Sequence, residues 1–353
     1  MPGQRLKYEQ YIPYLESNGY TLRIFPFFSP ETYRSLYDRG KFWKKVVGVL
    51  SGFMRRIYQL RSVTKADGIY VFLNVVPVGP VFIDRLFVSL SKRVIFDIDD
   101  MVHLNKTSPG NQIARLFRPN ERYFYLMRRA DHVITCTPAL DSLVRRYNHQ
   151  TTDISSTVDT DRYIPVVKYA NDKLLVIGWS GSHSTVQYLY LLTEVFQRLA
   201  AVCRFKLLVL GTGNFSIDGV EVESIPWSTE VELPTLQRMD IGVYPLPDDE
   251  WVKGKSGLKA IQYMSLGLPV VAANVGCNDR VIEDGLSGLL VRTDQDWFCA
   301  LRRLITEPFL REAIGLRARR RVEELFSVRA NRDKYLRIFR KVYNEHVHNV
   351  DGI

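Results

Sequence analysis

The second half of the chain alternates short apolar runs with longer amphipathic stretches. Apolar runs of this length are typical of buried strands, whereas the stretches between them have the periodicity of helices. The predicted strands are residues 174–179, 205–211, 220–225, 241–244, 269–273 and 288–291. The predicted helices are residues 184–199, 230–239, 258–266 and most of 294–346. This alternation predicts a doubly wound parallel sheet with helices on both faces.

The first half follows the same alternation less regularly. Its predicted strands are residues 21–27, 68–73, 93–98 and 132–136, and its predicted helices are residues 7–18, 42–62, 120–129 and 138–147. A chain of 353 residues is long enough for two domains of ordinary size, each with its own core. We therefore expect an α/β protein of two Rossmann-like domains, with the boundary between Ser155 and Lys173.

The formal net charge of +10 predicts an anionic partner, which could be a nucleotide sugar, an anionic lipid or a nucleic acid. Lys and Arg gather in residues 41–56, 115–129 and 311–321. The sequence shows no zinc-ligand spacing, aromatic ribonucleoprotein motif or helix-turn-helix signature, so no nucleic-acid partner is expected.

Apolar side chains lie among the basic ones in the first of these regions, residues 41–56. This pattern fits an amphipathic helix resting on an anionic membrane surface. It fits equally a helix that packs its apolar face on the core and exposes its basic face to solvent. Both placements stay open at this point.

The cellular location follows from what the sequence lacks. No apolar run approaches the roughly 18–20 residues that span a bilayer, and the N-terminus has no basic-then-apolar signal layout. Cys136, Cys203, Cys277 and Cys299 have no paired metal-ligand spacing and are typical of thiols in a reducing compartment. We expect a cytoplasmic protein, with a peripheral position on the inner face of the membrane left open.

Residues 253–257 form a basic, glycine-rich loop that leads directly into the predicted helix 258–266. A helix N-terminus presents unpaired N–H groups and the positive end of a dipole, so it suits an anion. Gly254 and Gly257 allow a close backbone approach, and Lys255 adds a mobile positive charge. A diphosphate site is predicted, although an ordinary loop–helix–strand unit has the same pattern.

A second loop with this potential contains Ser180, Gly181 and Ser182, between a predicted strand and a predicted helix. Backbone amides converge at such a position and can bind an anion. The alternative is that Ser182 or Ser184 caps the helix.

The segment from Lys253 to Ala273, with its Gln262-Tyr-Met-x-x-Gly-x-Pro-Val-Val run, resembles the donor-binding segment of the retaining group-1 (family 4) glycosyltransferases. The resemblance continues through Val275-Gly276 and residues 283–291. Ser156–Pro165 is similar to the family's interdomain segment, although Ser156-Thr157 replaces the usual Asn-Gly.

The resemblance implies the GT-B fold, in which two Rossmann-like domains face a cleft. Residues 1–160 would form the acceptor-side domain and residues 161–325 the nucleotide-sugar domain. Residues 326–353 would form a C-terminal helix, for which a return to the N-terminal domain stays open.

The resemblance also assigns roles around the first loop. Lys255 would neutralise the leaving diphosphate, with Ser256 beside it, and the amides of Gly257 and Leu258 would bind the same group. Many family members carry two glutamates eight positions apart, which here are Gly254 and Gln262. Gln262 could still bind ribose hydroxyls, but the contact of the first glutamate with the sugar is lost. The commoner family sequence also has a basic residue in the 180–182 loop, and this chain has none there.

Other residues follow by position in the family. Trp227 lies where the nucleotide base stacks, although burial in the core is as compatible with its position. Asp99, Asp100 and His103 would orient the acceptor hydroxyl or the transferred sugar, the alternative being a strand-end turn with capping aspartates. We expect residues 248–250 to be a solvated acidic loop, because GT-B enzymes generally need no metal ion.

The start of the chain departs from the family pattern. Arg5–Leu15 resembles the helix that normally follows the first strand, and that strand is missing. Either the coding sequence begins further upstream, or the N-terminal domain lacks its first strand. The second case would expose sheet edges and damage the acceptor side.

The predicted function is retaining, metal-independent transfer of a hexosyl group from a nucleotide-sugar donor to a glycan or lipid-linked acceptor, in cell-surface polysaccharide biosynthesis. No cofactor is expected, because the nucleotide sugar is the substrate. Two alternatives stay open: a nucleotide-sugar epimerase on the same fold, and a catalytically weak partner subunit that binds glycan or lipid.

Overall fold

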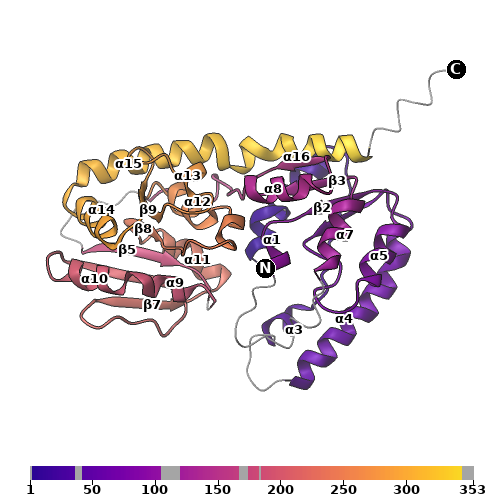
Figure 1. Ribbon diagram of the computed structural model, residues 1–353, viewed down its shortest axis with the longest axis horizontal. Coiled ribbons are helices and arrows are strands. Elements are labelled where there is room, and N and C mark those ends of the chain that lie inside the picture. The colour runs from indigo at the N-terminus through magenta and orange to yellow at the C-terminus, as the bar shows by residue number, and fades with distance from the viewer. Residues whose placement is uncertain (1, 36–41, 105–119, 167–173, 183, 344–353) are drawn as a thin grey trace. The chain divides into compact units, whose positions relative to one another are not determined.

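The computed structural model describes residues 2–35, 42–104, 120–166, 174–182 and 184–343 (Figure 1). The chain divides into two compact units. The first unit comprises Met1–Gln10 and Ser155–Arg332, and the second comprises Tyr11–Ile154 and Asp333–Ile353. Each unit is built around a parallel sheet with helices, the Rossmann-like arrangement that the sequence predicts.

The sheet of the first unit has six parallel strands in the order β10-β9-β8-β5-β6-β7. They are β5 (Leu175–Ser180), β6 (Phe205–Gly211), β7 (Val222–Pro226), β8 (Ile241–Tyr244), β9 (Val270–Ala273) and β10 (Leu289–Val291). All six strands predicted in this half are therefore confirmed. The strand order reverses between β8 and β5, and open α/β sheets bind ligands at such a switch point, beyond the carboxyl ends of the strands.

Helices cover both faces of this sheet. They are α1 (Pro2–Lys7), α9 (Val186–Leu189), η4 (Tyr190–Leu192), α10 (Thr193–Ala200), α11 (Thr229–Leu236), η5 (Val252–Gly254), α12 (Leu258–Ser265), α13 (Asn278–Val281), α14 (Asp294–Thr306), α15 (Pro308–Arg321) and η6 (Val322–Phe326). The predicted helix 184–199 is in fact three short pieces, α9, η4 and α10. All of β8 and β9 is buried, which explains why these strands read as unbroken apolar runs.

The described residues of the second unit form four parallel strands in the order β1-β2-β3-β4. They are β1 (Ile69–Phe72), β2 (Val94–Asp97), β3 (His132–Thr135) and β4 (Thr151–Asp153). Its helices are η1 (Glu9–Tyr11), which starts in the first unit, α2 (Ile12–Ser17), α3 (Pro30–Ser35), α4 (Phe42–Val63), α5 (Phe82–Leu90), η2 (Val102–Leu104), α7 (Glu121–Arg129), α8 (Pro138–Arg145) and most of α16 (Val328–Tyr343).

Two predictions for the start of the chain are wrong. Residues 21–27 form no strand; the Phe27 ring instead packs edge-on against the Phe53 ring at 5.4 Å. The predicted helix 7–18 is broken into α1, η1 and α2, and a proline at the first turn of α2 cannot continue a preceding helix. Among residues 2–35, no strand precedes β1, so β1 lies at an edge of the described sheet.

The C-terminal helix α16 contributes to the core of the second unit. Tyr335 stacks on Tyr11 with ring centroids 4.1 Å apart, and Phe339 stacks on Tyr70 at 6.1 Å. Burial raises the pKa of the Tyr335 hydroxyl well above its usual range, with a further contribution from the nearby Asp97 carboxylate. These aromatic contacts tie the two ends of the second unit's sequence together.

No helix in the described part of the chain combines the length and the hydropathy needed to cross a bilayer. The longest described helix, α4, has 22 residues, but five of them are Lys or Arg.

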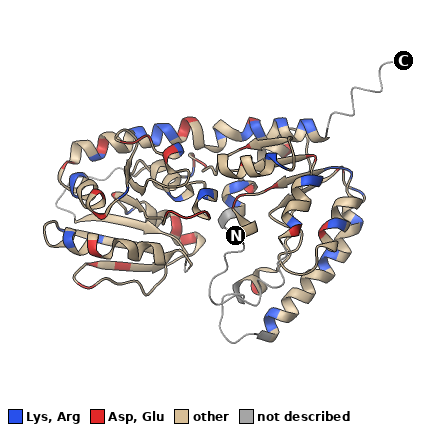
Figure 2. Cartoon of the chain, viewed as in Figure 1, with Lys and Arg blue, Asp and Glu red and all other residues tan. Residues whose placement is uncertain are grey.

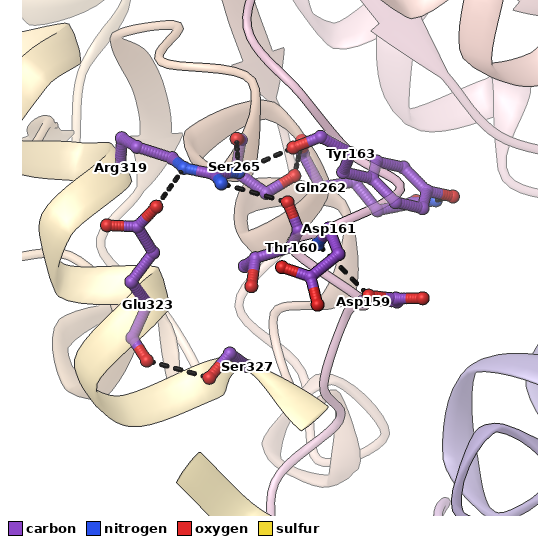
Figure 3. Close-up of polar contacts among 9 residues, drawn as sticks. All are labelled: Asp159, Thr160, Asp161, Tyr163, Gln262, Ser265, Arg319, Glu323 and Ser327. Carbon is purple, nitrogen blue, oxygen red and sulfur yellow. Dashed lines mark hydrogen bonds and ion pairs between the residues drawn. The ribbon is translucent and has the colours of Figure 1, made fainter. Parts of the chain in front are cut away.

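Arg319 of α15 binds three backbone carbonyls of the first unit (Figure 3). Its guanidinium donates to the carbonyls of Thr160, Tyr163 and Ser265, and its Nε lies 2.6 Å from the Glu323 carboxylate. The side chain is only 17% exposed, so these bonds are largely protected from water. Arg319 therefore fixes residues 160–163 against the C-terminal end of α12.

Replacing Arg319 by Ala should destabilise the first unit by about 2–4 kcal/mol, because it leaves buried carbonyls without donors. Urea unfolding followed by tryptophan fluorescence measures this unit, since Trp179, Trp227, Trp251 and Trp297 all lie in it. The matched control is Arg320→Ala on the same helix, where the side chain is exposed. Equal effects of the two substitutions would show that the hydrogen bonds of Arg319 do not stabilise the first unit.

Acid should destabilise the second unit through His132. Burial, helped by the Lys341 ammonium, lowers the pKa of His132 to about 4. Between the ordinary pKa of about 6.5 and pH 4, the unfolded chain binds a proton that the folded chain does not. The free energy of unfolding should therefore be fully retained above pH 6.5 and fall by about 2–3 kcal/mol by pH 4.5.

Urea unfolding followed by circular dichroism at pH 7.5 and 4.5 tests this pH dependence. His132→Gln should reduce the loss between the two pH values, whereas the exposed control His149→Gln should leave it unchanged. An unchanged pH dependence in His132→Gln would show that another group is responsible.

Candidate functional site

The turn that starts α12, residues 254–258, is here called the α12 turn. Gly257 is the N-cap residue and has a left-handed φ of +74°, and a Cβ at this position would lie 2.8 Å from Cγ2 of Val281. Only glycine meets both conditions without strain. The first helical bond is donated by Ile261 N–H to the Gly257 carbonyl, and no side chain caps the helix. The N–H groups of residues 258–260 therefore have no acceptor within the helix, as an anion site requires.

Lys255 lies in the α12 turn in an extended conformation and is half-buried. Its Nζ is 4.7 Å from the centroid of the Trp251 ring, a cation–π distance. The neighbouring Lys253 is exposed and pairs with the Glu250 carboxylate at 2.7 Å. The two lysines of this loop thus differ: Lys253 is exposed and pairs with a carboxylate, whereas Lys255 is half-buried with its ammonium over an aromatic ring.

Ser256 is buried in the α12 turn, and its hydroxyl lies 2.6 Å from the hydroxyl of Ser156. The two residues are a hundred positions apart in the sequence. This bond connects the turn to Ser156, near the start of the Ser155–Arg332 stretch of the first unit. The side chain of Ser256 thus helps to fix the turn.

Gln262 is completely buried on α12. Its amide donates to the Tyr163 hydroxyl at 3.1 Å and to the Glu232 carboxylate at 3.2 Å, and it accepts from Lys259 Nζ at 3.2 Å. Glu232 also forms an ion pair with Arg5. Burial alone would raise the pKa of Glu232, but Lys259 and Arg5 hold it below the usual value.

Sequence reasoning missed this polar cluster of Arg5, Tyr163, Glu232, Lys259 and Gln262. Burial lowers the pKa of Lys259 and raises the pKa of the Tyr163 hydroxyl. The members come from four distant parts of the sequence, and nothing in their local patterns distinguishes them from ordinary surface residues. Only their packing brings them together.

The loop at residues 180–182 has its backbone amides occupied. Their N–H groups donate, in order, to the Tyr263 hydroxyl at 2.6 Å, the Leu210 carbonyl at 2.9 Å and the Thr185 hydroxyl at 2.8 Å. Burial raises the pKa of the Tyr263 hydroxyl to about 12, which keeps it protonated. Ser180 is buried and Ser182 is exposed, so this loop offers an anion the Ser182 hydroxyl rather than convergent N–H groups.

Trp227 directly follows β7, half-buried against the core. Asp249 accepts a hydrogen bond from the Val252 N–H at 2.9 Å, in the turn that leads into the short helix η5. Among the residues that the structure describes, no three or more His, Cys, Asp and Glu side chains are grouped to hold a metal ion.

Asp99, Asp100 and His103 follow the carboxyl end of β2 and belong to the second unit. All three are half-buried. The Asp100 carboxylate accepts from the Met101 N–H at 2.9 Å, as a turn-capping aspartate does. The His103 ring, in η2, lies 6.0 Å from the Phe124 ring.

Asp97, two residues before Asp99, has a different position. It is fully buried and accepts a hydrogen bond from the Tyr70 hydroxyl. The sequence motif does not separate it from the more accessible Asp99 and Asp100. Its role in the structure is to tie β2 to β1.

A hollow of about 510 Å³ also lies in the second unit, between β4 and α16. His132, Thr152, Lys334, Arg337 and Lys341 are among the residues that line it, and none of the predicted site residues does. Lys341 donates to the Gln150 side chain across this hollow at 2.5 Å. The hollow is therefore separate from the α12 turn.

Comparison with known proteins places the α12 turn inside a recognised domain. Residues 173–307 match the family model described as glycosyl transferases group 1. The D-inositol 3-phosphate glycosyltransferase of Saccharomonospora viridis is 29% identical over 245 residues, which cover 61% of this chain and 57% of that protein. The chain thus spans little more than half the length of this curated relative.

Solved structures share the fold at low identity. A glycosyltransferase from Rickettsia africae matches with a TM-score of 0.67 and 13% identity, covering 95% of this chain and 94% of its own. The Anabaena protein HepE, solved in complex with UDP and glucose, matches with a TM-score of 0.61 and 14% identity, covering 82% of each chain. These likenesses confirm the predicted GT-B fold class of two Rossmann-like domains.

Gly257→Ala should destabilise the first unit by about 2–4 kcal/mol, from the left-handed φ and from the contact with Val281. Gly285→Ala is a matched control, because Gly285 has the same φ of +74° and open space around its Cβ position. The control should cost only about 1–2 kcal/mol, the strain of the left-handed backbone. Urea unfolding followed by tryptophan fluorescence measures both, and equal costs would argue against close packing of the α12 turn.

Proposed function

We propose that this chain, whose residues 173–307 match the family model of the group-1 glycosyltransferases, is a member of that family and transfers a sugar from a nucleotide-sugar donor to an acceptor. The observation that carries the proposal is the α12 turn. There, the N–H groups of residues 258–260 lack helical acceptors, and Lys255 lies beside them in the loop. Both features favour a diphosphate.

The chemistry follows from where charge develops. As the glycosidic bond breaks, negative charge builds on the leaving nucleoside diphosphate, and fixed donors at that point lower the barrier. The α12 turn supplies donors that are already oriented, because Gly257 and Ser256 fix it before any ligand binds. Since the amides of residues 180–182 have protein acceptors, the N–H groups of α12 and Lys255 would carry most of this stabilisation.

The finer assignments are part of the same proposal. Trp227 stacks on the nucleotide base, and Asp99, Asp100 and His103 position the acceptor hydroxyl. The reaction retains the anomeric configuration and needs no metal ion. The acceptor is a glycan or a lipid-linked sugar of cell-surface polysaccharide biosynthesis, reached from the cytoplasmic side of the membrane.

One observation favours a second candidate function, a partner subunit that binds glycan or lipid without efficient turnover. The two positions at which many relatives carry glutamate are Gly254 and Gln262, and Gln262 is enclosed in the polar cluster. Neither position supplies a carboxylate to the donor sugar. Calorimetric titration with nucleotide sugars separates the two functions, because a pure binding subunit for glycan should give no heat with any donor.

Lys255→Ala should lower kcat/KM for donor turnover by about a hundredfold or more, because it removes a positive charge that the transition state uses. Release of nucleoside diphosphate from a panel of nucleotide sugars, with and without acceptor, measures this. Lys255→Arg should restore part of the activity by keeping the charge.

Lys253→Ala is the control for this substitution. Lys253 lies two residues away and pairs with Glu250, so its loss should leave turnover within about twofold of the parent protein. Full activity in Lys255→Ala would remove the α12 turn from the donor site.

A further inference from the structure

Helix α4 of the second unit exposes a continuous apolar stripe. Its members recur every three or four residues and so lie on one face of the helix. They are Trp43, Val47, Leu50, Met54, Ile57 and Tyr58. Each is between 58% and 76% exposed. Single exposed apolar side chains are ordinary on protein surfaces, but six on one helical face are not.

The opposite face of α4 is the one that packs, and it combines Gly48, Gly52, Arg56 and Gln59 with the apolar Val63 and the ring of Phe53. A Cβ at Gly48 would collide with Thr32, and one at Gly52 would lie 2.5 Å from the Phe27 ring, so the helix approaches residues 27–32 closely. Gln59 is also buried on this face. Of the apolar side chains that the sequence places among the basic ones, Trp43, Val47 and Leu50 are exposed, so the apolar residues of this helix do not all pack on the core.

Arg56 fixes this orientation. It is buried on the packed face, and its guanidinium donates to the carbonyls of Val75 at 2.8 Å and Phe25 at 2.9 Å. Turning the apolar stripe inward would break these bonds and leave the buried Val75 carbonyl without its donor. The stripe is thus held outward by specific contacts on the other side of the helix.

All the charged side chains of α4 are basic. The helix carries Lys44, Lys45, Arg55, Arg56 and Arg61 and no Asp or Glu, as Figure 2 shows. Of these, only Arg56 is buried, and Lys44 and Arg61 are exposed. An apolar stripe with basic side chains beside it is the composition that lies in the interface of an anionic bilayer.

The neighbouring helix α5 contacts α4 and has exposed apolar residues of its own. Phe82, Leu86 and Leu90 follow one another at four-residue spacing and are 62%, 37% and 38% exposed. The apolar surface of this part of the second unit is therefore not confined to a single helix.

We propose that the apolar stripe of α4 docks this chain on an anionic phospholipid bilayer. The helix lies in the plane of the interface with Trp43 and the aliphatic side chains among the lipid chains, while Lys44, Arg55 and Arg61 contact the headgroups. A second copy of the chain fits this surface less well, because pairing two such helices would bring like charges together with no carboxylate on either helix. The inference is independent of the sugar-transfer proposal, which it complements by bringing the enzyme to lipid-linked acceptors.

Sedimentation with vesicles tests the docking without any nucleotide sugar. Binding of the full chain to vesicles of phosphatidylcholine and phosphatidylglycerol should exceed binding to phosphatidylcholine alone and should weaken as salt increases. Leu50→Glu combined with Met54→Glu should lower binding by about tenfold or more. Lys44→Gln should lower it by about fivefold.

The matched control is Phe309→Glu combined with Leu316→Glu on α15 of the first unit. These two side chains are 86% and 67% exposed, so the variant has the same change in charge and loses the same kind of surface residue. It should bind vesicles nearly as well as the parent protein. Equal losses in the two double variants, or equal binding to neutral and anionic vesicles, would overturn the proposal.

Two further measurements identify the occupant of the stripe. Lipids brominated on their acyl chains should quench Trp43, and the quenching should be lost in Trp43→Phe. Sedimentation velocity without lipid should show the same oligomeric state for the parent and for the Leu50→Glu, Met54→Glu variant. Absence of Trp43 quenching would overturn the proposal, and a change of oligomeric state would replace it with self-association through α4.

Discussion

The first unit depends on one constraint, the left-handed turn at Gly257. At this position α12 can begin only without a Cβ, because Val281 occupies the space beside it. Once started, the helix is held along its length: the Ser256–Ser156 hydrogen bond fixes the turn, and the Tyr263 hydroxyl binds the end of β5. Arg319 holds the far end through the Ser265 carbonyl. The N–H groups at the start of α12 are consequently rigid before any ligand arrives, which is what stabilisation of a developing charge requires.

The polar cluster around Gln262 gives a physical reason for the departure from the family's glutamate pattern. Gln262 donates its amide to Glu232 at 3.2 Å, and Glu232 is already balanced by Lys259 and Arg5. A glutamate at position 262 would place a second carboxylate beside the first in a buried site, where like charges strongly disfavour each other. An amide keeps the shape and replaces the repulsion by a hydrogen bond. The buried carboxylate of Glu232 thus explains why position 262 carries an amide and not a second carboxylate.

Much of the fold follows from sequence because both faces of the first unit's sheet are covered. Its central strands β8 and β9 read as continuous apolar runs, and all six strands were predicted. Strand β4 was missed because its three residues, Thr151–Asp153, are polar and only half-buried. Residues 21–27 have the apolar character of a strand, but they form no strand, and the Phe27 ring packs on Phe53 of α4. The α12 turn was predicted from its glycines and lysines. The partners that fix the turn are distant in the sequence and could not be predicted from it.

Helix α4 shows most clearly where sequence patterns stop being informative. Periodicity identifies which face of a helix is apolar, but not whether that face is buried. In α12 the apolar residues face the core, as the pattern suggests. In α4 the orientation is set by contacts on the packed face. Gly48 and Gly52 allow close packing there, and Arg56 donates hydrogen bonds to backbone carbonyls. This packing leaves six apolar side chains exposed on the other face, and the basic side chains beside them favour the anionic bilayer proposed above.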